Sequence, residues 1–386
     1  MAGIRIIADD LTGALDAAGA FADRLRPMTV LLPGAAAPWP EDIAVDTETR
    51  DVPESEAAAR VARVAPRLAG ADRAYKKIDS LLRGHAMAET AALMRAGGFR
   101  SLVVAPGFPE QRRITCAGRQ WWCDPGSGTW RPSETDLIDA LARHGIRARR
   151  IRPPVRPSGA DALVCDVTAT DHLDRIAAAG PELAEPVLWC GAAGLAGALA
   201  RVDASNAPEP TAERDLGPSA HGIGATLAIC GSVAPAAVAQ MRVAAERWPG
   251  IVLTPAPGSG PDAIARTVAA RRNGGGRALI VDMTAGMAGD ATTTRAAIAD
   301  RLAALAGSVP APERLVIMGG ATLHDLSVAL GATRLVVERT LQAGIPVSRF
   351  GDGAWAGVEV VSKSGGFGDP AFLIRQFELE EDGNDD

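Results

Sequence analysis

The sequence is poor in the side chains that most often bind transition metals or form disulfide frameworks. Its five histidines stand at no metal-ligand spacing, and its five cysteines are scattered without a CxxC pair. The odd number and the scatter of the cysteines indicate reduced thiols, as in a cytoplasmic protein. We therefore expect neither a metal site built from protein ligands nor a disulfide framework.

The chain also lacks a basic excess and long apolar runs. Its net charge is −6, whereas a nucleic-acid-binding surface needs a basic face. No stretch approaches the roughly 20 apolar residues of a membrane span, and the first residues do not have the pattern of a signal peptide. These features predict a cytoplasmic protein that binds neither nucleic acid nor membranes.

The chain does contain a regular alternation of short apolar runs, polar or glycine-rich loops and helical periodicity. This pattern predicts an α/β fold, and 386 residues are enough for two domains, each a largely parallel sheet flanked by helices. In such sheets, ligands bind beyond the carboxyl ends of the strands. Candidate site residues are therefore expected where the predicted strands end.

Three segments interrupt the alternation. Residues 111–132 predict a long loop or hairpin near the site, with Trp121, Trp122 and Trp130 packed as a cluster. Residues 203–222 are rich in proline and lack apolar periodicity, which is typical of a linker. The domains are accordingly predicted at 1–202 and 223–377, followed by an acidic, disordered tail at 378–386.

The segment 4–21 predicts a buried strand at 4–8, a turn at Thr12 and Gly13, and a helix from Ala14. Asp9 and Asp10 stand where this strand ends. Two carboxylates there indicate a polar site for a hydroxyl, a cation or both. The alternative is that one of them only caps the following helix.

A second charged loop, residues 76–83, follows another predicted strand. Lys76, Lys77 and Arg83 could hold a substrate carboxylate, and Asp79 could accept a hydroxyl hydrogen bond or a proton. Arg50 ends a further strand and would lie on the same rim. The alternative is a solvated loop with internal ion pairs.

The second half contains glycine-rich turns after strands, at 231–232, 319–322 and 363–368. Glycine lets the backbone approach a ligand closely, and a helix that follows directs N–H groups at phosphate. Ser232 and Thr322 add hydroxyl groups, and Lys363, which precedes Gly365 and Gly366, could meet a phosphate by its charge. Purely structural turns are the alternative. The P-loop and GxGxxG spacings are absent, which disfavours a P-loop ATPase and a standard dinucleotide-binding domain.

Five of these segments, at 7–14, 76–84, 231–232, 319–322 and 363–369, together resemble the four-carbon acid sugar kinases, long known as a domain of unknown function. The resemblance implies a two-domain ATP-dependent kinase with its active site in the inter-domain cleft. Its N-terminal domain would hold threonate, erythronate or 3-oxo-tetronate, its C-terminal domain would hold ATP, and the product would be the 4-phosphate. Two departures from the family pattern are Ala321, where an acidic residue is usual, and Arg112, where a glycine is usual.

The resemblance also implies roles for individual residues. The acid-sugar contacts would be Asp9, Asp10, Arg50, Lys77, Ile78, Asp79 and Ser80, and the nucleotide contacts would be Ser232, Gly319, Gly320, Ala321, Thr322 and Gly365.

The mechanism expected from these residues is phosphoryl transfer between bound substrates. Arg83, Arg50 and a lysine at 76–77 would fix the carboxylate, and Asp79 or Asp10 would orient the terminal hydroxyl and accept its proton. Mg²⁺ would bridge the ATP phosphates. A non-catalytic sensor of acid sugar or nucleotide is the alternative, motivated by Ala321, and a dehydrogenase is disfavoured. A homodimer stays open.

Overall fold

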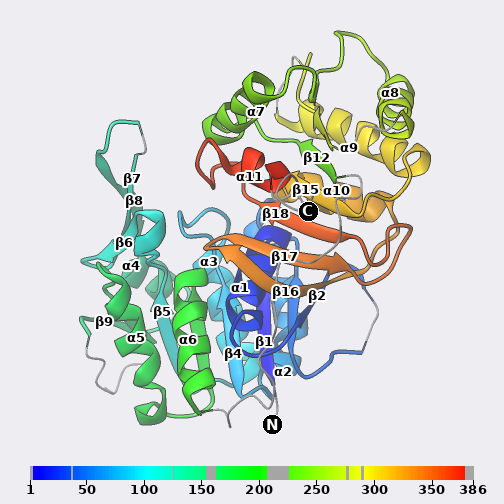
Figure 1. Ribbon diagram of the computed structural model, residues 1–386. Helices are drawn as coiled ribbons and strands as arrows, with labels where there is room; N and C mark the ends of the chain where they lie inside the picture. The colour runs from blue at the N-terminus through cyan, green and yellow to red at the C-terminus, as the bar shows by residue number, and fades with distance from the viewer. Residues whose placement is uncertain are drawn as a thin grey trace. The chain divides into compact units, whose positions relative to one another are not determined.

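The computed structural model describes residues 3–35, 38–124, 126–153, 162–206, 226–274, 278–287 and 291–378 (Figure 1). The chain divides into two compact units, the first formed by Met1–Glu209 with Val337–Ala343 and the second by Pro210–Val336 with Gly344–Asp386. The predicted α/β class is confirmed. The sequence did not predict that Val337–Ala343 belongs to the first unit.

The first unit is built on a sheet in which all neighbouring strands are parallel. Except in the edge strand Ala148–Ile151, most residues of these strands are buried, as expected for a sheet covered on both faces. In sheet order they are β2 (Met28–Leu31), β3 (Ile43–Asp46), β1 (Ile4–Ala8), β4 (Arg73–Lys77), β11 (Val187–Gly191), β5 (Ser101–Ala105), β10 (Ala162–Cys165) and β9 (Ala148–Ile151).

Helices cover both faces of this sheet (Figure 1). On one face, α1 packs against α6 and α6 packs against α5; on the other, α2 and α4 pack on either side of α3 and share one apolar core with the sheet. Two 3₁₀ turns, η1 (Pro109–Gln111) and η2 (Gly180–Glu182), complete the unit. The helices are α1 (Leu11–Ala22), α2 (Glu54–Leu68), α3 (Ala86–Gly97), α4 (Leu137–Arg143), α5 (Thr170–Ala178) and α6 (Ala193–Asn206).

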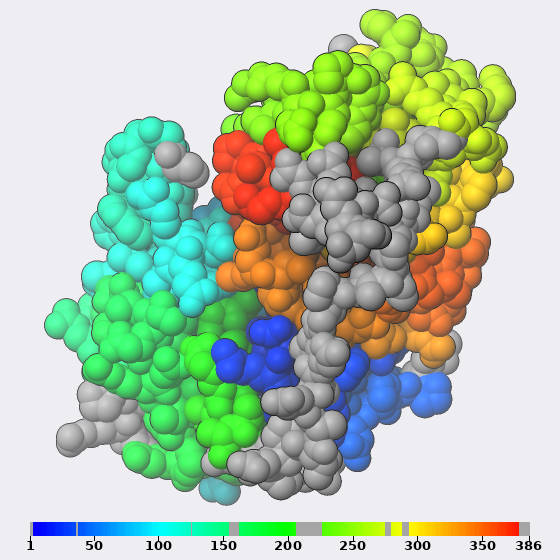
Figure 2. Space-filling view, viewed as in Figure 1, coloured from blue at the N-terminus to red at the C-terminus, as the bar shows by residue number. Residues whose placement is uncertain are grey.

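A small antiparallel sheet interrupts the first unit, formed by β6 (Arg113–Cys116), β7 (Arg119–Cys123) and β8 (Trp130–Asp136). Figure 2 shows it in cyan at the surface of this unit. The sequence predicted a loop or hairpin here and missed the third strand. The expected tryptophan cluster is wrong, because Trp121 and Trp122 are neighbours in a strand and point to opposite faces, and Trp130 is 42% exposed.

In the second unit, the strands from β13 to β18 pair in parallel, and β17 pairs antiparallel with β18. Helix α7 packs on α11, and α9 packs on α8 and α10. The strands in sheet order are β13 (Val252–Leu253), β14 (Ala278–Asp282), β12 (Thr226–Cys230), β15 (Arg314–Met318), β18 (Glu359–Lys363) and β17 (Ile345–Phe350); β16 is Arg334–Gln342, and the helices are α7 (Pro235–Arg247), α8 (Pro261–Asn273), α9 (Ala291–Ser308), α10 (Gly320–Ala329) and α11 (Phe372–Glu378).

The end of α6 corrects the predicted start of the linker. This helix continues through Asn206, and Asp203 within it accepts hydrogen bonds from Arg73 Nε at 2.9 Å and Nη2 at 2.6 Å. The bidentate ion pair ties the last helical turn to β4, so the periodic segment is longer than its apolar pattern indicated. The remaining linker residues, 207–222, and tail residues 379–386 lie outside the described residues. No helix among the described residues is long and apolar enough to cross a membrane.

Candidate active site

The carboxyl end of β1 carries a dense carboxylate–guanidinium network. The Asp9 carbonyl accepts hydrogen bonds from the backbone N–H groups of Thr49 at 3.0 Å and Arg50 at 3.2 Å, which anchors the loop after β3. Arg50 then donates from Nε to Asp9 Oδ2 at 2.8 Å, from Nη2 to Asp9 Oδ1 at 3.0 Å, and from Nη1 to Asp10 Oδ2. The structure therefore brings together Asp9, Asp10 and Arg50, three residues predicted to share a rim.

Asp10 is both a helix cap and a member of this network. Its backbone is extended, with φ −148°, and its Oδ1 accepts a hydrogen bond from the Gly13 N–H at 2.8 Å, so α1 begins at Leu11. The predicted turn at Thr12 and Gly13 is therefore wrong. Gly13 is needed for a different reason, because a Cβ there would lie 2.7 Å from Asp10 Oδ1 and 3.2 Å from Lys77 Nζ.

The two lysines of β4 point to opposite faces of the sheet, as consecutive strand residues must. Lys76 is fully buried, and its Nζ lies 2.5 Å from Glu89 Oε2 on α3. Burial lowers the pKa of Lys76, but the negative charges of Glu89 and Asp9 outweigh it and raise the pKa above its usual value. Because this ammonium is buried in an ion pair, we leave Lys76 out of the substrate contacts proposed below.

Lys77 faces α1 and lies close to the carboxylates. Its Nζ donates to the Ile78 carbonyl at 3.1 Å. Burial raises the pKa of Asp10, and the charges of Arg50 and Lys77 oppose that rise. The Lys77 charge also contributes to the lowered pKa of Asp79. The Ile78 side chain is 1% exposed and belongs to the apolar core beneath α2 and α3. Of the predicted pair of lysines, only Lys77 is placed to meet a ligand at this edge.

Asp79 organises the loop that follows β4. Its carboxylate accepts two hydrogen bonds from Arg83, at 3.0 Å from Nε and 2.8 Å from Nη2, and two more from the backbone N–H groups of Leu81 and Arg83. Burial raises the pKa of Asp79, but these bonds and the charges of Arg83, Arg50 and Lys77 bring it well below its usual value. Such a carboxylate is a weak proton acceptor, which disfavours the predicted role of Asp79 as a base.

The small antiparallel sheet meets this loop at Ser80. Arg113 donates from Nη1 to Ser80 Oγ, and Gln120 donates from Nε2 to the carbonyls of Ser80 at 2.9 Å and Pro106 at 3.2 Å. The sequence analysis singled out neither Arg113 nor Gln120. The richness of residues 111–132 in arginine was the only signal for them.

In the second unit, three of the predicted glycine turns lie at one edge of the sheet. Cys230 pairs with Met318 and Met318 pairs with Lys363, so β12, β15 and β18 end in register. The Gly231 N–H donates to the Met318 carbonyl at 3.1 Å, and the Gly319 N–H donates to the Lys363 carbonyl at 3.0 Å. The turns 231–232, 319–322 and 364–366 are therefore neighbours.

Close packing between these turns explains their glycines. A Cβ on Gly231 would lie 2.0 Å from Thr322 Oγ1, and a Cβ on Gly365 would lie 1.8 Å from Ser232 Oγ. Gly319 has φ +122°, a conformation that side chains disfavour. Beyond it, α10 begins at Gly320 with Ala321 exposed in its first turn, so unpaired backbone N–H groups face this edge.

Lys363 supports the third turn from within. It is 2% exposed, and its Nζ donates to the carbonyls of Phe367 at 2.8 Å and Ser364 at 3.2 Å and lies 5.6 Å from the centre of the Phe372 ring. Burial lowers the pKa of Lys363 to about 8. These contacts hold the shape of the loop and disfavour the expectation that Lys363 itself meets a phosphate.

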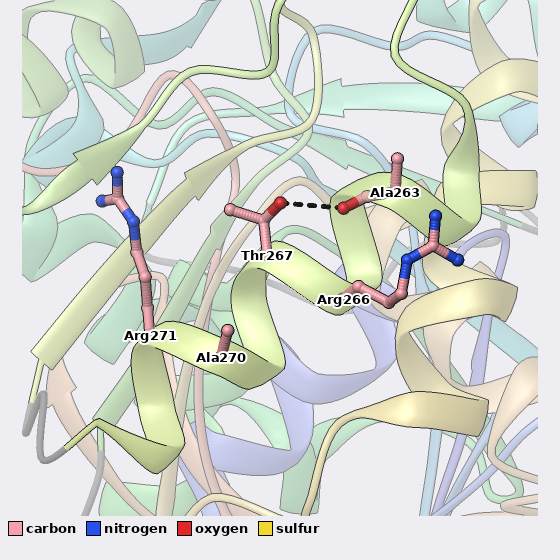
Figure 3. A pocket seen from close by; sticks show the side chains of 5 residues that line it. All are labelled: Ala263, Arg266, Thr267, Ala270 and Arg271. Atoms are coloured by element: carbon pink, nitrogen blue, oxygen red, sulfur yellow. Dashed lines mark hydrogen bonds between the residues drawn. The ribbon is translucent and has the colours of Figure 1, made fainter.

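A surface hollow of about 610 Å³ lies elsewhere in the second unit (Figure 3). Thr267 in its wall donates to the Ala263 carbonyl at 2.8 Å. All the residues that line it belong to α8 and none to a strand end, so we do not take it as the site. Within the described ranges, no group of three or more His, Cys, Asp and Glu could hold a metal ion. The surface hollow on α8 is lined by Ala263, Arg266, Thr267, Ala270 and Arg271.

Comparison with known proteins matches each of the two units to a domain family. Residues 4–134 match the family model of a sugar-binding N-terminal domain, and residues 227–373 match that of a nucleotide-binding C-terminal domain. A D-threonate kinase from Cupriavidus necator is 31% identical over 95% of each chain, and one from Bordetella bronchiseptica is 29% identical over 96% of each. These relatives define the class as a sugar acid kinase. The chain belongs to the four-carbon acid sugar kinase family.

Solved structures share the fold over the whole chain. A Salmonella typhimurium protein described as a putative tRNA synthase superposes with a TM-score of 0.76 at 22% identity, covering 97% of this chain and 99% of that one. A Haemophilus influenzae protein superposes with a TM-score of 0.68 at 17% identity, covering 98% and 100%. At these identities the likeness shows the fold alone.

Proposed function

We propose that the protein is an ATP-dependent kinase that phosphorylates the terminal hydroxyl of a four-carbon acid sugar to give its 4-phosphate. The observation that carries the proposal is the network of Asp9, Asp10, Arg50, Asp79 and Arg83 at the strand ends of the first unit. Threonate, erythronate and 3-oxo-tetronate are the candidate substrates. D-threonate is the first to test, because both full-length relatives are named for it.

Both the hydroxyl groups and the carboxylate of an acid sugar would meet suitable partners at the strand ends of the first unit. Its hydroxyls would donate to the carboxylates of Asp9 and Asp10, which Arg50 holds in place by hydrogen bonds. Its carboxylate would meet Lys77 and Arg83, whose side chain is 61% exposed although Asp79 orients it. Ser80, held by Arg113 and Gln120, would lie beside them.

The nucleotide would bind at the glycine edge of the second unit. The phosphates would accept hydrogen bonds from the turns around Ser232 and Gly365 and from the first turn of α10, at Gly319, Gly320, Ala321 and Thr322, with Gly366 alongside. Because Mg²⁺ keeps several waters and takes one or two carboxylates plus phosphates, it needs no cage of protein ligands. Asp282, which ends β14 opposite Cys230, would be the carboxylate that holds it.

In this proposal the protein contributes mainly position and charge. Phosphoryl transfer passes through a loose transition state, so holding the acceptor hydroxyl in line matters more than a strong base. Mg²⁺, when bound with ATP, neutralises the phosphate charge. Arg50 and Asp79 keep the acceptor side rigid because each forms several charge-assisted hydrogen bonds.

The test is a screen of the purified chain with ATP and Mg²⁺ against four- and five-carbon sugar acids, read by coupled release of ADP. We expect rapid ADP release with at least one four-carbon acid and slower release with five-carbon acids. The alternative, a sensor, rests on Ala321, which places no carboxylate in the exposed first turn of α10. A sensor would show a ligand-induced thermal shift but no ADP with any acid, and that result would contradict the kinase.

A further inference from the structure

Helix α1 carries one more carboxylate at this edge, Asp16, which the sequence analysis did not select. Asp16 follows Gly13 by three residues, so the two lie on the same face of the helix. Gly13 is in turn packed against Asp10 Oδ1 and Lys77 Nζ. Asp16 therefore lies one helical turn from the part of α1 that meets the proposed substrate contacts, and it is half-buried.

The bonding of Asp16 differs from that of its three neighbours. Asp9 is held by two donors of Arg50, Asp10 by Arg50 and the Gly13 N–H, and Asp79 by Arg83 and two backbone N–H groups. Among the residues that the structure describes, Asp16 accepts no hydrogen bond and forms no ion pair. Because none of the described residues donates to it, this half-buried carboxylate is free to accept a hydrogen bond from a ligand.

The charged surroundings of Asp16 come from several elements. α6, which packs against α1, has no titratable side chain between Ala193 and Ala200. Burial raises the pKa of Asp16 to about 6, with the Lys77 charge opposing and the Asp10 charge adding to the effect. The titratable groups that interact with the Asp16 charge are Lys77 and Tyr75 of β4, Asp10 at the helix cap and Arg113 of β6. Asp46 ends β3, which also packs on α1.

We propose that Asp16 is a catalytic residue, which accepts a hydrogen bond from the terminal hydroxyl of the acid sugar and takes its proton during phosphoryl transfer. The hydroxyl O–H bond breaks as its oxygen bonds to the γ-phosphorus, and the bond from that phosphorus to the β-phosphate oxygen breaks with ADP as the leaving group. The proton ends on Asp16 and then leaves to water. This inference rests on the proposed kinase activity.

The surroundings of Asp16 suit this step better than those of Asp79. A group that accepts a proton works best when its pKa lies near the working pH, as the pKa of Asp16 does at about 6. The charged carboxylate also destabilises the fold. Its pKa is about 6 in the folded state and 3.8 in the unfolded state, so the free energy of unfolding falls as the pH rises between these two values.

The experiment compares wild type with Asp16→Asn and Asp16→Glu, with Asp171→Asn on the exposed start of α5 as the matched control. We expect Asp16→Asn to lower kcat at least ~100-fold with KM for the acid sugar within about threefold, and to raise Tm by about 2 °C or more. Asp16→Glu should regain part of kcat. Wild-type kcat/KM should fall tenfold per pH unit below about pH 6, and Asp16→Asn should lose this dependence.

Each other outcome overturns the inference in a recognisable way. If Asp16→Asn keeps kcat within about threefold of an active wild type, the role of Asp16 is wrong and the proposed kinase stands. If Asp16→Asn lowers Tm together with kcat, the residue is structural. If wild type releases no ADP with any acid, the kinase proposal itself fails and this role fails with it.

Discussion

At the scale of residues, the proposed acid-sugar site depends on which carboxylate each arginine holds. Arg50 uses Nε, Nη1 and Nη2 on Asp9 and Asp10, and Arg83 uses Nε and Nη2 on Asp79. These charge-assisted bonds hold the carboxylates rigidly and compensate their charge. Changing one partner therefore alters both the geometry and the charge that a substrate would meet.

Asp79→Ala tests this coupling. The change frees Arg83 and removes a negative charge 4.0 Å from Arg50 Nη2, so the loop that follows β4 loses its shape. We expect kcat/KM for the acid sugar to fall at least ~100-fold, because misplacing a substrate by about 1 Å can cost that much, while ATP affinity stays unchanged. Steady-state kinetics measure the first quantity and calorimetric titration the second. Near-normal kcat/KM would remove Asp79 from the site.

Gly365→Ala tests the nucleotide edge. A Cβ there would lie 1.8 Å from Ser232 Oγ, so the two turns must separate. Overpacking of this kind costs about 1–3 kcal/mol, and we expect Kd for ATP to rise roughly tenfold or more with acid-sugar binding unchanged. The control is Gly307→Ala on α9, where an added Cβ meets nothing within 4 Å. Equal ATP affinity in Gly365→Ala and wild type would contradict the assignment of this edge.

At the scale of elements, β4 joins the site to the core through its alternating side chains. Lys77 faces α1 and the carboxylates, whereas Lys76 forms a fully buried ion pair with Glu89 of α3. The loop after β4 is held from its other side by Gln120 of β7. The position of β4 and the loop that follows it thus depends on contacts with α1, α3 and β7.

Lys76→Met tests the buried pair. Removing one partner of a buried ion pair leaves an uncompensated charge, so we expect the free energy of unfolding to fall by about 3 kcal/mol. The double variant Lys76→Met/Glu89→Leu should recover most of that loss, because an apolar pair of similar volume needs no desolvation of charge. Thermal unfolding of the two variants makes the comparison. A single variant as stable as wild type would mean that the pair carries no stability.

The sequence predicted elements well where periodicity is strong and poorly where it is mixed. Strand β1 was predicted with its observed ends, because the short apolar run at 4–8 stops at two aspartates. Strands β17 and β18 were missed, since they contain Pro346, Arg349, Glu359 and Lys363 among their apolar residues. These positions fit into strands because β17 and β18 pair with each other and β18 pairs with β15, which is distant in sequence. Periodicity along the chain does not show such pairing.

The same limit applies to the site. Strand ends placed Asp9, Asp10, Arg50 and Lys77 in one region, because parallel strands end at one edge. The sequence could not separate Lys76 from Lys77, since the difference comes from Glu89 on another helix. Nor could it show that no described residue donates to Asp16, because that depends on which carboxylates the nearby arginines bind.

At the scale of the whole molecule, each unit carries half of the proposed chemistry. The first unit matches a sugar-binding domain and holds the carboxylate–arginine network, and the second matches a nucleotide-binding domain and holds the glycine edge. The relatives named D-threonate kinase extend over nearly the full length of both. In the proposed reaction, one chain therefore uses both substrates.

The most direct measurement is the structure of the product formed from ATP, Mg²⁺ and the best acid in the screen, by ³¹P–¹H correlation spectroscopy. The account predicts a phosphate monoester whose phosphorus couples to the two protons of the terminal carbon, formed in equal amount with ADP. A phosphorus coupled to a single C2 or C3 proton, or ADP formed without any ester, would contradict it.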